Sequence, residues 1–232
     1  MITRDLILTG GFSKGYVSKS KSVVVQPVFA GANLAVRREV LTELGGFDGA
    51  MGTREDADLS LRVAGSKWLT FFDERAVVAH RFRATFRQMI RQWFDYGRYH
   101  ARVLAKHTRP GVEIFAPTGT NRGMMSFRLP FPLRVFIPLT LFHLFHGALA
   151  GTVVALALHW HLLAAMMAAL TAWIGINHFL LPFPRRERGA WIVFLCFRYA
   201  MNWAFVVGGL VGGFANGMLN IEPTHDRNGL PD

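Results

Sequence analysis

The sequence predicts a chain of two parts, an α/β segment followed by an α-helical membrane domain of about three transmembrane helices. Helix and strand patterns alternate through the first 83 residues, which is typical of an α/β layer. The apolar residues, 51% of the chain, also form long runs after residue 134. The α/β segment is therefore the expected location of functional residues, and the apolar segment is the expected membrane domain.

Three apolar runs indicate the membrane domain. Residues 135–158 and 162–181 contain no Asp, Glu, Lys or Arg, and residues 190–219 contain only Arg198. A bilayer core of about 30 Å needs roughly 20 apolar residues in a helix, so each run is long enough to span it. Helices buried in a soluble core are the alternative, but they rarely run so far without a charge. We therefore expect residues 135–219 to form the transmembrane domain and 220–232 a polar tail.

The basic residues indicate how the spans are oriented. Of the 26 Lys and Arg residues, 21 precede residue 135, and three more lie at positions 185–188, between the second and third spans. Cytoplasmic loops are enriched in Lys and Arg, so both regions are expected in the cytoplasm and the tail on the far side. The net charge of +11 then favours membrane lipid and anionic phosphate substrates as partners, rather than nucleic acid.

The first 83 residues predict short alternating elements. The β-branched run 23–29 is typical of a strand, and residues 38–44 of a short helix that Gly45 and Gly46 end. A second helix is expected from Thr53, as its cap, to Gly65. Two short strands are expected at 68–72 and 76–79.

Residues 85–106 predict a long amphipathic helix within an interfacial and linker region, 84–134. Aromatic and aliphatic residues recur at helical spacing on one face, and four arginines form a second stripe at positions 87, 91, 98 and 102. An aromatic face beside a cationic face, just before membrane spans, indicates a helix in the bilayer interface. An ordinary surface helix with solvated arginines is the alternative.

The densest acidic cluster is Glu55, Asp56 and Asp58 at the start of the second helix. Amide dipoles stabilise carboxylates at a helix N-terminus, so helix capping is one interpretation. The other is that one carboxylate serves as a general base, because an acceptor hydroxyl is a poor nucleophile until its proton is removed.

Five motifs in order, over about 70 residues, bear on the second interpretation. They read Gly31-Ala32-Asn33-Leu34-Ala35-Val36-Arg37-Arg38, Leu44-Gly45-Gly46-Phe47-Asp48, Arg54-Glu55-Asp56-Ala57-Asp58-Leu59-Ser60-Leu61-Arg62, Ala79-His80-Arg81 and Arg91-Gln92-Trp93-Phe94-Asp95-Tyr96-Gly97-Arg98. Together they resemble the second half of a family 2 glycosyltransferase.

The resemblance implies a GT-A fold and inverting transfer from a nucleotide-activated sugar. It assigns the catalytic base to Asp56, with Glu55 beside it at the acceptor site. The same resemblance implies further acceptor, sugar, diphosphate or metal contacts at Gly31, Asn33, Asp58, Gln92, Trp93, His80 and Arg81.

The segment around Trp93 resembles the Gln-x-x-Arg-Trp motif of processive synthases, in which an aromatic ring stacks on the growing glycan. Gln92 separates Arg91 from Trp93, so the ring is displaced by one position. This departure favours a non-processive enzyme. The continuation resembles transferases of bacterial exopolysaccharide and lipid-linked glycan assembly, which implies a multi-pass protein of the bacterial inner membrane with a cytoplasmic catalytic segment.

The family's nucleotide-binding half, with its Asp-x-Asp motif, is not found before Asp56. A divalent cation, Mg or Mn, is expected from the family, but Asp56-Ala57-Asp58 lies within a predicted helix and is not interpreted as its ligand set. We therefore expect a partial GT-A domain that lacks its nucleotide-binding half, is inactive alone, and acts with a separate chain or as part of a longer product. A non-catalytic membrane anchor or scaffold remnant of glycan assembly is the alternative function.

Overall fold

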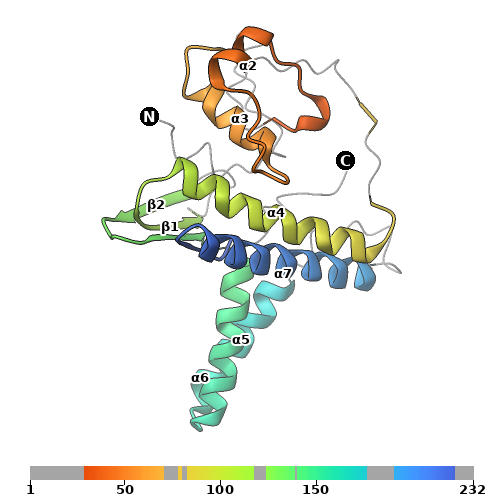
Figure 1. Ribbon diagram of the computed structural model, residues 1–232. Helices are drawn as coiled ribbons and strands as arrows, with labels where there is room; N and C mark the ends of the chain where they lie inside the picture. Colours follow the sequence, from red (N-terminus) through yellow and green to blue (C-terminus); the bar gives the residue numbers. More distant parts are fainter. Residues whose placement is uncertain are drawn as a thin grey trace, which may run out of the picture.

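The computed structural model describes residues 29–70, 78–79, 83–117, 124–138, 140–176 and 191–222. Figure 1 shows two short helices above a pair of long helices, α4 and α7, that lie side by side. A small sheet lies at one end of this pair. A hairpin of two helices, α5 and α6, projects away from the opposite side of the pair.

The upper unit contains η1 (Gly31–Asn33), α2 (Arg38–Leu44) and α3 (Glu55–Ala64). Val40, Leu59 and Val63 form its small core. Gly45 ends α2 in the left-handed conformation at φ 77°, which glycine adopts without a steric penalty, so the predicted end of this helix is confirmed. The predicted cap of α3 is wrong, because Arg54 is the N-cap residue and no side chain caps the helix.

The long helix α4 (Phe86–His107) confirms the predicted amphipathic helix, and Thr85 caps it by accepting the Gln88 N–H bond. Its apolar face, however, does not face lipid, because α7 (Trp191–Ala215) packs along it. Glycines allow the two backbones to touch: an added Cβ at Gly208 would meet the Phe94 carbonyl, and one at Gly212 would meet the Arg98 carbonyl. The interfacial interpretation of this face of α4 is therefore replaced by a helix pair.

Gly208→Ala should separate this helix pair. The new methyl group would overlap the Phe94 carbonyl, which belongs to a helix backbone and cannot yield as a flexible side chain could. We expect a loss of about 3 kcal/mol in the free energy of unfolding. The urea midpoint of tryptophan fluorescence in detergent measures this loss. Gly147→Ala is the matched control, because nothing lies within 4 Å of its added Cβ. Equal midpoints for the two variants would contradict close packing at Gly208.

A four-stranded sheet, ordered β2-β1-β3-β4, occupies segments that were expected to be linker and membrane. It contains β1 (Gly111–Pro117), β2 (Met124–Leu129), β3 (Arg134–Pro138) and β4 (Met218–Asn220). Strand β1 pairs antiparallel with β2 and parallel with β3, and β4 adds parallel to β3. The expectation that the first span starts at residue 135 and the third ends at 219 is therefore wrong at both ends. β-Branched and aromatic residues in a short run fit a strand as well as a helix, so hydropathy alone did not separate them.

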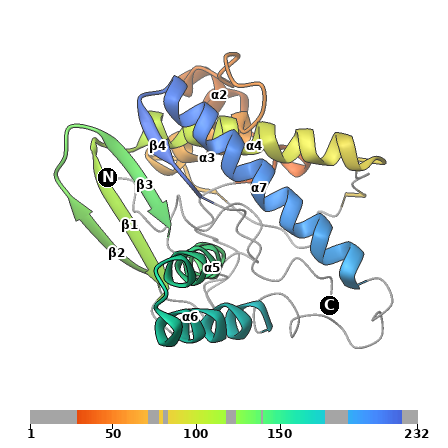
Figure 2. The same ribbon diagram turned by 90° about the horizontal axis from the view of Figure 1, so that it is seen from below.

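The hairpin consists of α5 (Leu141–Ala157) and α6 (His161–Ile174), joined by a tight turn in which His159 is left-handed at φ 59°. Figure 2, seen from below, shows the two helices side by side, near one end of the sheet. Among the described residues, only Leu195–Ala215 of α7 has both the length and the hydropathy of a membrane span, and α5 and α6 are shorter apolar helices. The predicted strand at 23–29 lies almost wholly outside the described residues. The strand predicted at 68–72 is described only over 68–70, which form no strand, and residues 76 and 77 of the other also lie outside.

Candidate active site

Asp56 lies in the first turn of α3 and joins this helix to the loop that precedes α2. Its Oδ2 accepts a hydrogen bond of 2.6 Å from the Gly31 N–H. Its Oδ1 accepts one of 2.7 Å from the Ala57 N–H. The side chain is partly exposed, and an ionised carboxylate has about four acceptor positions, so it retains capacity for a further donor.

The Gly31 loop is held closely against Asp56. A Cβ at Gly31 would lie 3.3 Å from the Asp56 Cβ, so the position leaves little room for a side chain. A second bond supports the contact: the Phe29 N–H donates to the Ser60 Oγ at 3.0 Å. The structure therefore brings together Gly31 and Asp56, 25 residues apart, as the sequence motifs imply. Asn33 ends η1 and is exposed on the same loop, and Glu55, the first residue of α3, is partly exposed.

Arg54 connects Asp56 to the long helices. It has a left-handed backbone at φ 68°, an uncommon conformation for a residue with a side chain. Its guanidinium carbon lies 5.2 Å from the ring centre of Tyr96 on α4 and 5.9 Å from that of Phe205 on α7. The residue as a whole is partly buried, but its Nε is shielded from solvent and has no hydrogen-bond partner among the described residues. Burial lowers the pKa of the Arg54 guanidinium, and the Asp56 and Glu222 carboxylates oppose this shift.

Arg54 lies next to a cluster of three side chains on α4, Gln92, Trp93 and Tyr96, which we call the aromatic group. The Gln92 Nε2 donates to the Tyr96 hydroxyl at 2.8 Å. The Trp93 ring meets Tyr96 edge-on, with ring centres 5.7 Å apart. All three side chains are partly exposed. The structure therefore brings two predicted acceptor-site residues, Gln92 and Trp93, to a surface that is connected through Tyr96 and Arg54 to Asp56.

A buried histidine–carboxylate contact lies at the opposite end of the aromatic group. The His100 Nε2 on α4 lies 2.7 Å from the Glu222 Oε2, and the two side chains are 9% and 2% exposed. Glu222 follows β4, so the end of the described chain is fixed to the middle of α4. This contact contradicts the expected far-side tail at its first residues, because Glu222 packs against α4, the helix that also contacts Arg54.

Asp58 has a different environment from the one expected. It is fully buried, and its carboxylate pairs with Arg62 at 2.9 Å, His107 at 2.8 Å and Lys106 at 2.8 Å. These groups lower the pKa of Asp58 against the opposing effect of burial. Asp58 therefore joins α3 to the end of α4 and is not available to a sugar. Asp58 was expected to contact the acceptor because it stands beside Asp56 in the motif. Helical periodicity, however, directs the Asp58 side chain away from Asp56 and toward the core.

The described residues do not fit the expected Mg or Mn centre. Among them, no three His, Cys, Asp or Glu side chains come together in a way that could hold a metal ion. Asp56 accepts backbone N–H bonds and Asp58 is surrounded by cations, so this pair cannot act jointly as ligands. His80 and Arg81, the predicted diphosphate or metal contacts, lie outside the described residues.

Sequence reasoning missed four members of this arrangement: Arg54, Tyr96, His100 and Glu222. Arg54 and Tyr96 stand inside the quoted motifs, and the i to i+4 spacing of Gln92 and Tyr96 could have indicated their contact. No local pattern could have paired His100 with Glu222, because 122 residues separate them. Comparisons of this chain with known protein families, with curated proteins and with solved structures found no match.

Proposed function

We propose that this chain carries the acceptor side of a membrane-attached, inverting glycosyltransferase, which transfers a sugar from a nucleotide-sugar to a lipid-linked or polysaccharide acceptor. Asp56 is the general base, and Glu55 lies beside it at the acceptor site. The observation that supports this proposal most strongly is the continuous group from Asp56 through Arg54 to Tyr96 and Trp93.

The chemistry assigned to Asp56 is a single proton transfer. Its carboxylate removes the proton of the acceptor hydroxyl while that oxygen forms a bond to the anomeric carbon of the donor sugar. The bond from the anomeric carbon to the diphosphate breaks, and the nucleoside diphosphate leaves with the electron pair. Two backbone N–H donors fix the carboxylate, which leaves its remaining lone pairs for the acceptor.

The aromatic group is suited to hold the acceptor glycan. Sugar rings have apolar faces that stack on aromatic rings, and the partly exposed Trp93 and Tyr96 offer such surfaces. Arg54 adds a cation next to them, positioned to attract phosphate on a lipid-linked acceptor. A candidate base, a positive charge and a stacking surface in this order support the proposal.

Trp93→Ala should weaken acceptor binding more than it slows the chemistry. We expect KM for the acceptor to rise about tenfold, the effect of losing one aromatic contact, with kcat changed less. Initial rates in membranes at varied acceptor concentration measure the two constants. Tyr99→Phe is the control, since Tyr99 packs beside Met51 and Val103 away from the aromatic group. A kcat loss at constant KM would contradict a role in acceptor binding.

A transfer assay tests the function itself. Membranes from source cells that lack this gene, and from the same cells after its restoration, are supplied with a panel of labelled nucleotide-sugars. We expect one sugar to enter the lipid or polymer fraction only when the chain is present. Equal labelling in both membranes with every donor would overturn the proposal.

A non-catalytic scaffold in glycan assembly is the second candidate. It is favoured by the same two hydrogen bonds at Asp56, because a carboxylate that holds the Gly31 loop has a structural task without any substrate. Restoration of labelling by a chain that lacks the Asp56 carboxylate would favour this candidate over catalysis.

A further inference from the structure

We propose that α5 and α6 cross the bilayer as a two-helix hairpin, while α4 and α7 lie flat on one side of it. The chain end at residues 220–222 then stays on the side of Asp56. This inference rests on the membrane attachment within the proposed function, and it is independent of sugar transfer.

The surface of the hairpin fits hydrocarbon and not water. Residues 140–176 contain no Asp, Glu, Lys or Arg. Apolar side chains are exposed around both helices, among them Leu149, Val153, Leu156, Leu162, Met166 and Trp173. An apolar surface of this extent marks contact with a membrane or a partner. Among the described residues the hairpin packs mainly on itself, and its base contacts α7 through His146 and Tyr199.

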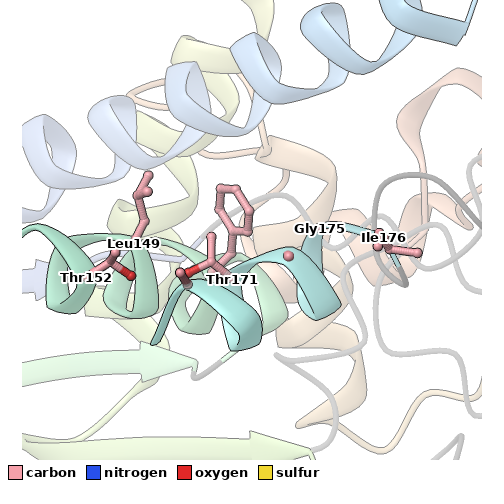
Figure 3. Close-up of a pocket in the computed structure, with 8 residues that line it drawn as sticks. Leu149, Thr152, Thr171, Gly175 and Ile176 are labelled. Atoms are coloured by element: carbon pink, nitrogen blue, oxygen red, sulfur yellow. The ribbon is translucent and has the colours of Figure 1, made fainter. Parts of the chain in front are cut away.

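The groove between the two helices shows the same character. It is lined by Phe145, Leu149, Thr152, Ala168, Thr171, Ala172, Gly175 and Ile176 (Figure 3). Its two hydroxyl groups are satisfied within their own helices, since Thr152 donates to the Ala148 carbonyl and Thr171 to the Met167 carbonyl, each at 2.8 Å. The groove therefore offers no free polar side chain to a soluble ligand, and lipid chains fit it.

The hairpin is shorter than a bilayer core of about 30 Å. The 17 residues of α5 extend for about 25 Å and the 14 residues of α6 for about 21 Å, and thinning of the bilayer around a short hydrophobic segment accommodates such a difference at a modest cost. Trp160 lies exposed at the tip. At the base, Phe142 and His146 contact Tyr199 and Trp203 of α7. Aromatic residues at both ends are typical of the two membrane interfaces.

Helix α7 is the longest apolar helix, yet its packing prevents it from crossing. It is joined to α4 through backbone contacts at Gly208 and Gly212. Along the same length α4 carries exposed Arg87, Arg91 and Arg98. If α7 crossed the bilayer, these arginines would enter the hydrocarbon without an acidic partner among the described residues, which is costly.

The exposed stripe of α7 faces the same side as the hairpin. It consists of Val193, Tyr199, Trp203, Val207, Val211 and Phe214. Trp203 contacts Phe142 at the hairpin base, with ring centres 5.6 Å apart, which places the stripe where the bilayer surface would lie. The arginines of α4 then lie near the lipid headgroups and Asp56 lies above them. A lipid-linked acceptor would reach Asp56 from the surface of the bilayer.

Single-cysteine labelling of the full chain in spheroplasts tests this topology. The background is Cys196→Ser, which removes the single native thiol. Cysteine is introduced at the hairpin tip (His159→Cys), on α2 (Glu39→Cys) and at the chain end (Asp232→Cys). A membrane-impermeant maleimide is added before and after permeabilisation, and carbonate extraction shows whether each variant remains in the membrane.

We expect the tip to react from outside, and the α2 and chain-end positions to react only after permeabilisation. Reaction of the chain end from outside would overturn the proposal, because α7 would then cross. The proposal would also be overturned if the chain resisted carbonate extraction but the cysteine at the tip did not react from outside. The hairpin would then enter the bilayer without crossing it. Release of the chain by carbonate would refute membrane insertion altogether. None of these outcomes depends on transfer activity, so the topology and the proposed reaction fail separately.

Discussion

Replacement of Asp56 by asparagine should lower sugar transfer by roughly 10²- to 10⁴-fold, the range for loss of a general base. Asparagine keeps the shape of the side chain, and its carbonyl oxygen can still accept the Gly31 N–H bond, although its NH2 group cannot replace the second oxygen as acceptor for the Ala57 N–H. It cannot accept the proton of the acceptor hydroxyl. The loss should therefore appear in kcat, with KM for the nucleotide-sugar nearly unchanged. Initial rates in membranes that hold equal amounts of each variant measure it.

Glu39→Gln is the matched control, because it also neutralises one carboxylate but lies exposed on α2, away from the Gly31 loop. It should retain normal transfer. Near-normal turnover in Asp56→Asn would return Asp56 to the role of a residue that holds the Gly31 loop.

Replacement of Asp58 by asparagine should lower the free energy of unfolding by about 3 kcal/mol, because it breaks a buried charge network and leaves its cations uncompensated. The loss stays near the lower limit for such networks, since Arg62 keeps its bonds to the Leu44 and Gly46 carbonyls and Lys106 keeps Asp48. Proteolysis at increasing urea in detergent measures the change.

Asp48→Asn provides the matched control. It removes the other carboxylate from the same lysine, but at a site that is 26% exposed, where water replaces the lost partner. Asp48→Asn should therefore lower the free energy of unfolding by much less than Asp58→Asn. If both variants lost equal stability, the importance of burial at Asp58 would be refuted.

Low pH should also weaken the buried charge network around Asp58. The pKa of Asp58 is lower in the folded chain than its ordinary value of 3.8. Its contribution to stability is therefore complete above that value and is lost as the pH falls through the lower folded pKa. The stability of Asp58→Asn should depend less on pH in this acidic range than that of the natural chain.

The sequence predicted the extents of α2, α3 and α4 well, because glycine ends and helical periodicity are local signals. Gly45 ends α2, as its position indicates. The cap of α3 was not predicted correctly, because Arg54 and not Thr53 precedes the helix. The motifs assigned Gly31 and Asp56 to one expected pocket; the hydrogen bond between them is a finding of the structure, and the base role of Asp56 stays a prediction.

The sequence-based predictions were wrong where the structure of an apolar segment depends on the element that packs or pairs with it. Residues 135–138 were expected to begin a membrane helix. They form part of strand β3 instead, because β1 and β4 pair with it on either side. The apolar face of α4 read as a lipid contact until α7 covered it. The glycines of α7 lie where its backbone touches α4, and the apolar run around them did not show that the partner is a helix that carries arginines. Hydropathy measures how well a residue tolerates hydrocarbon and does not identify its neighbour.

The pairing of His100 with Glu222 has a consequence for synthesis of the chain. Helix α4 is complete at His107, but the elements that cover its apolar face, α7 and β4, are made roughly 100 residues later. At about 5–20 residues per second the ribosome needs on the order of 5–20 s to supply them. During this interval the uncovered face of α4 needs a temporary partner, and in the proposed topology the nearest apolar surface is the bilayer that receives α5 and α6. If the hairpin inserts as proposed, its insertion would precede the packing of α7 on α4, and a ribosome that stalls before residue 191 would leave a chain that is anchored but incompletely folded.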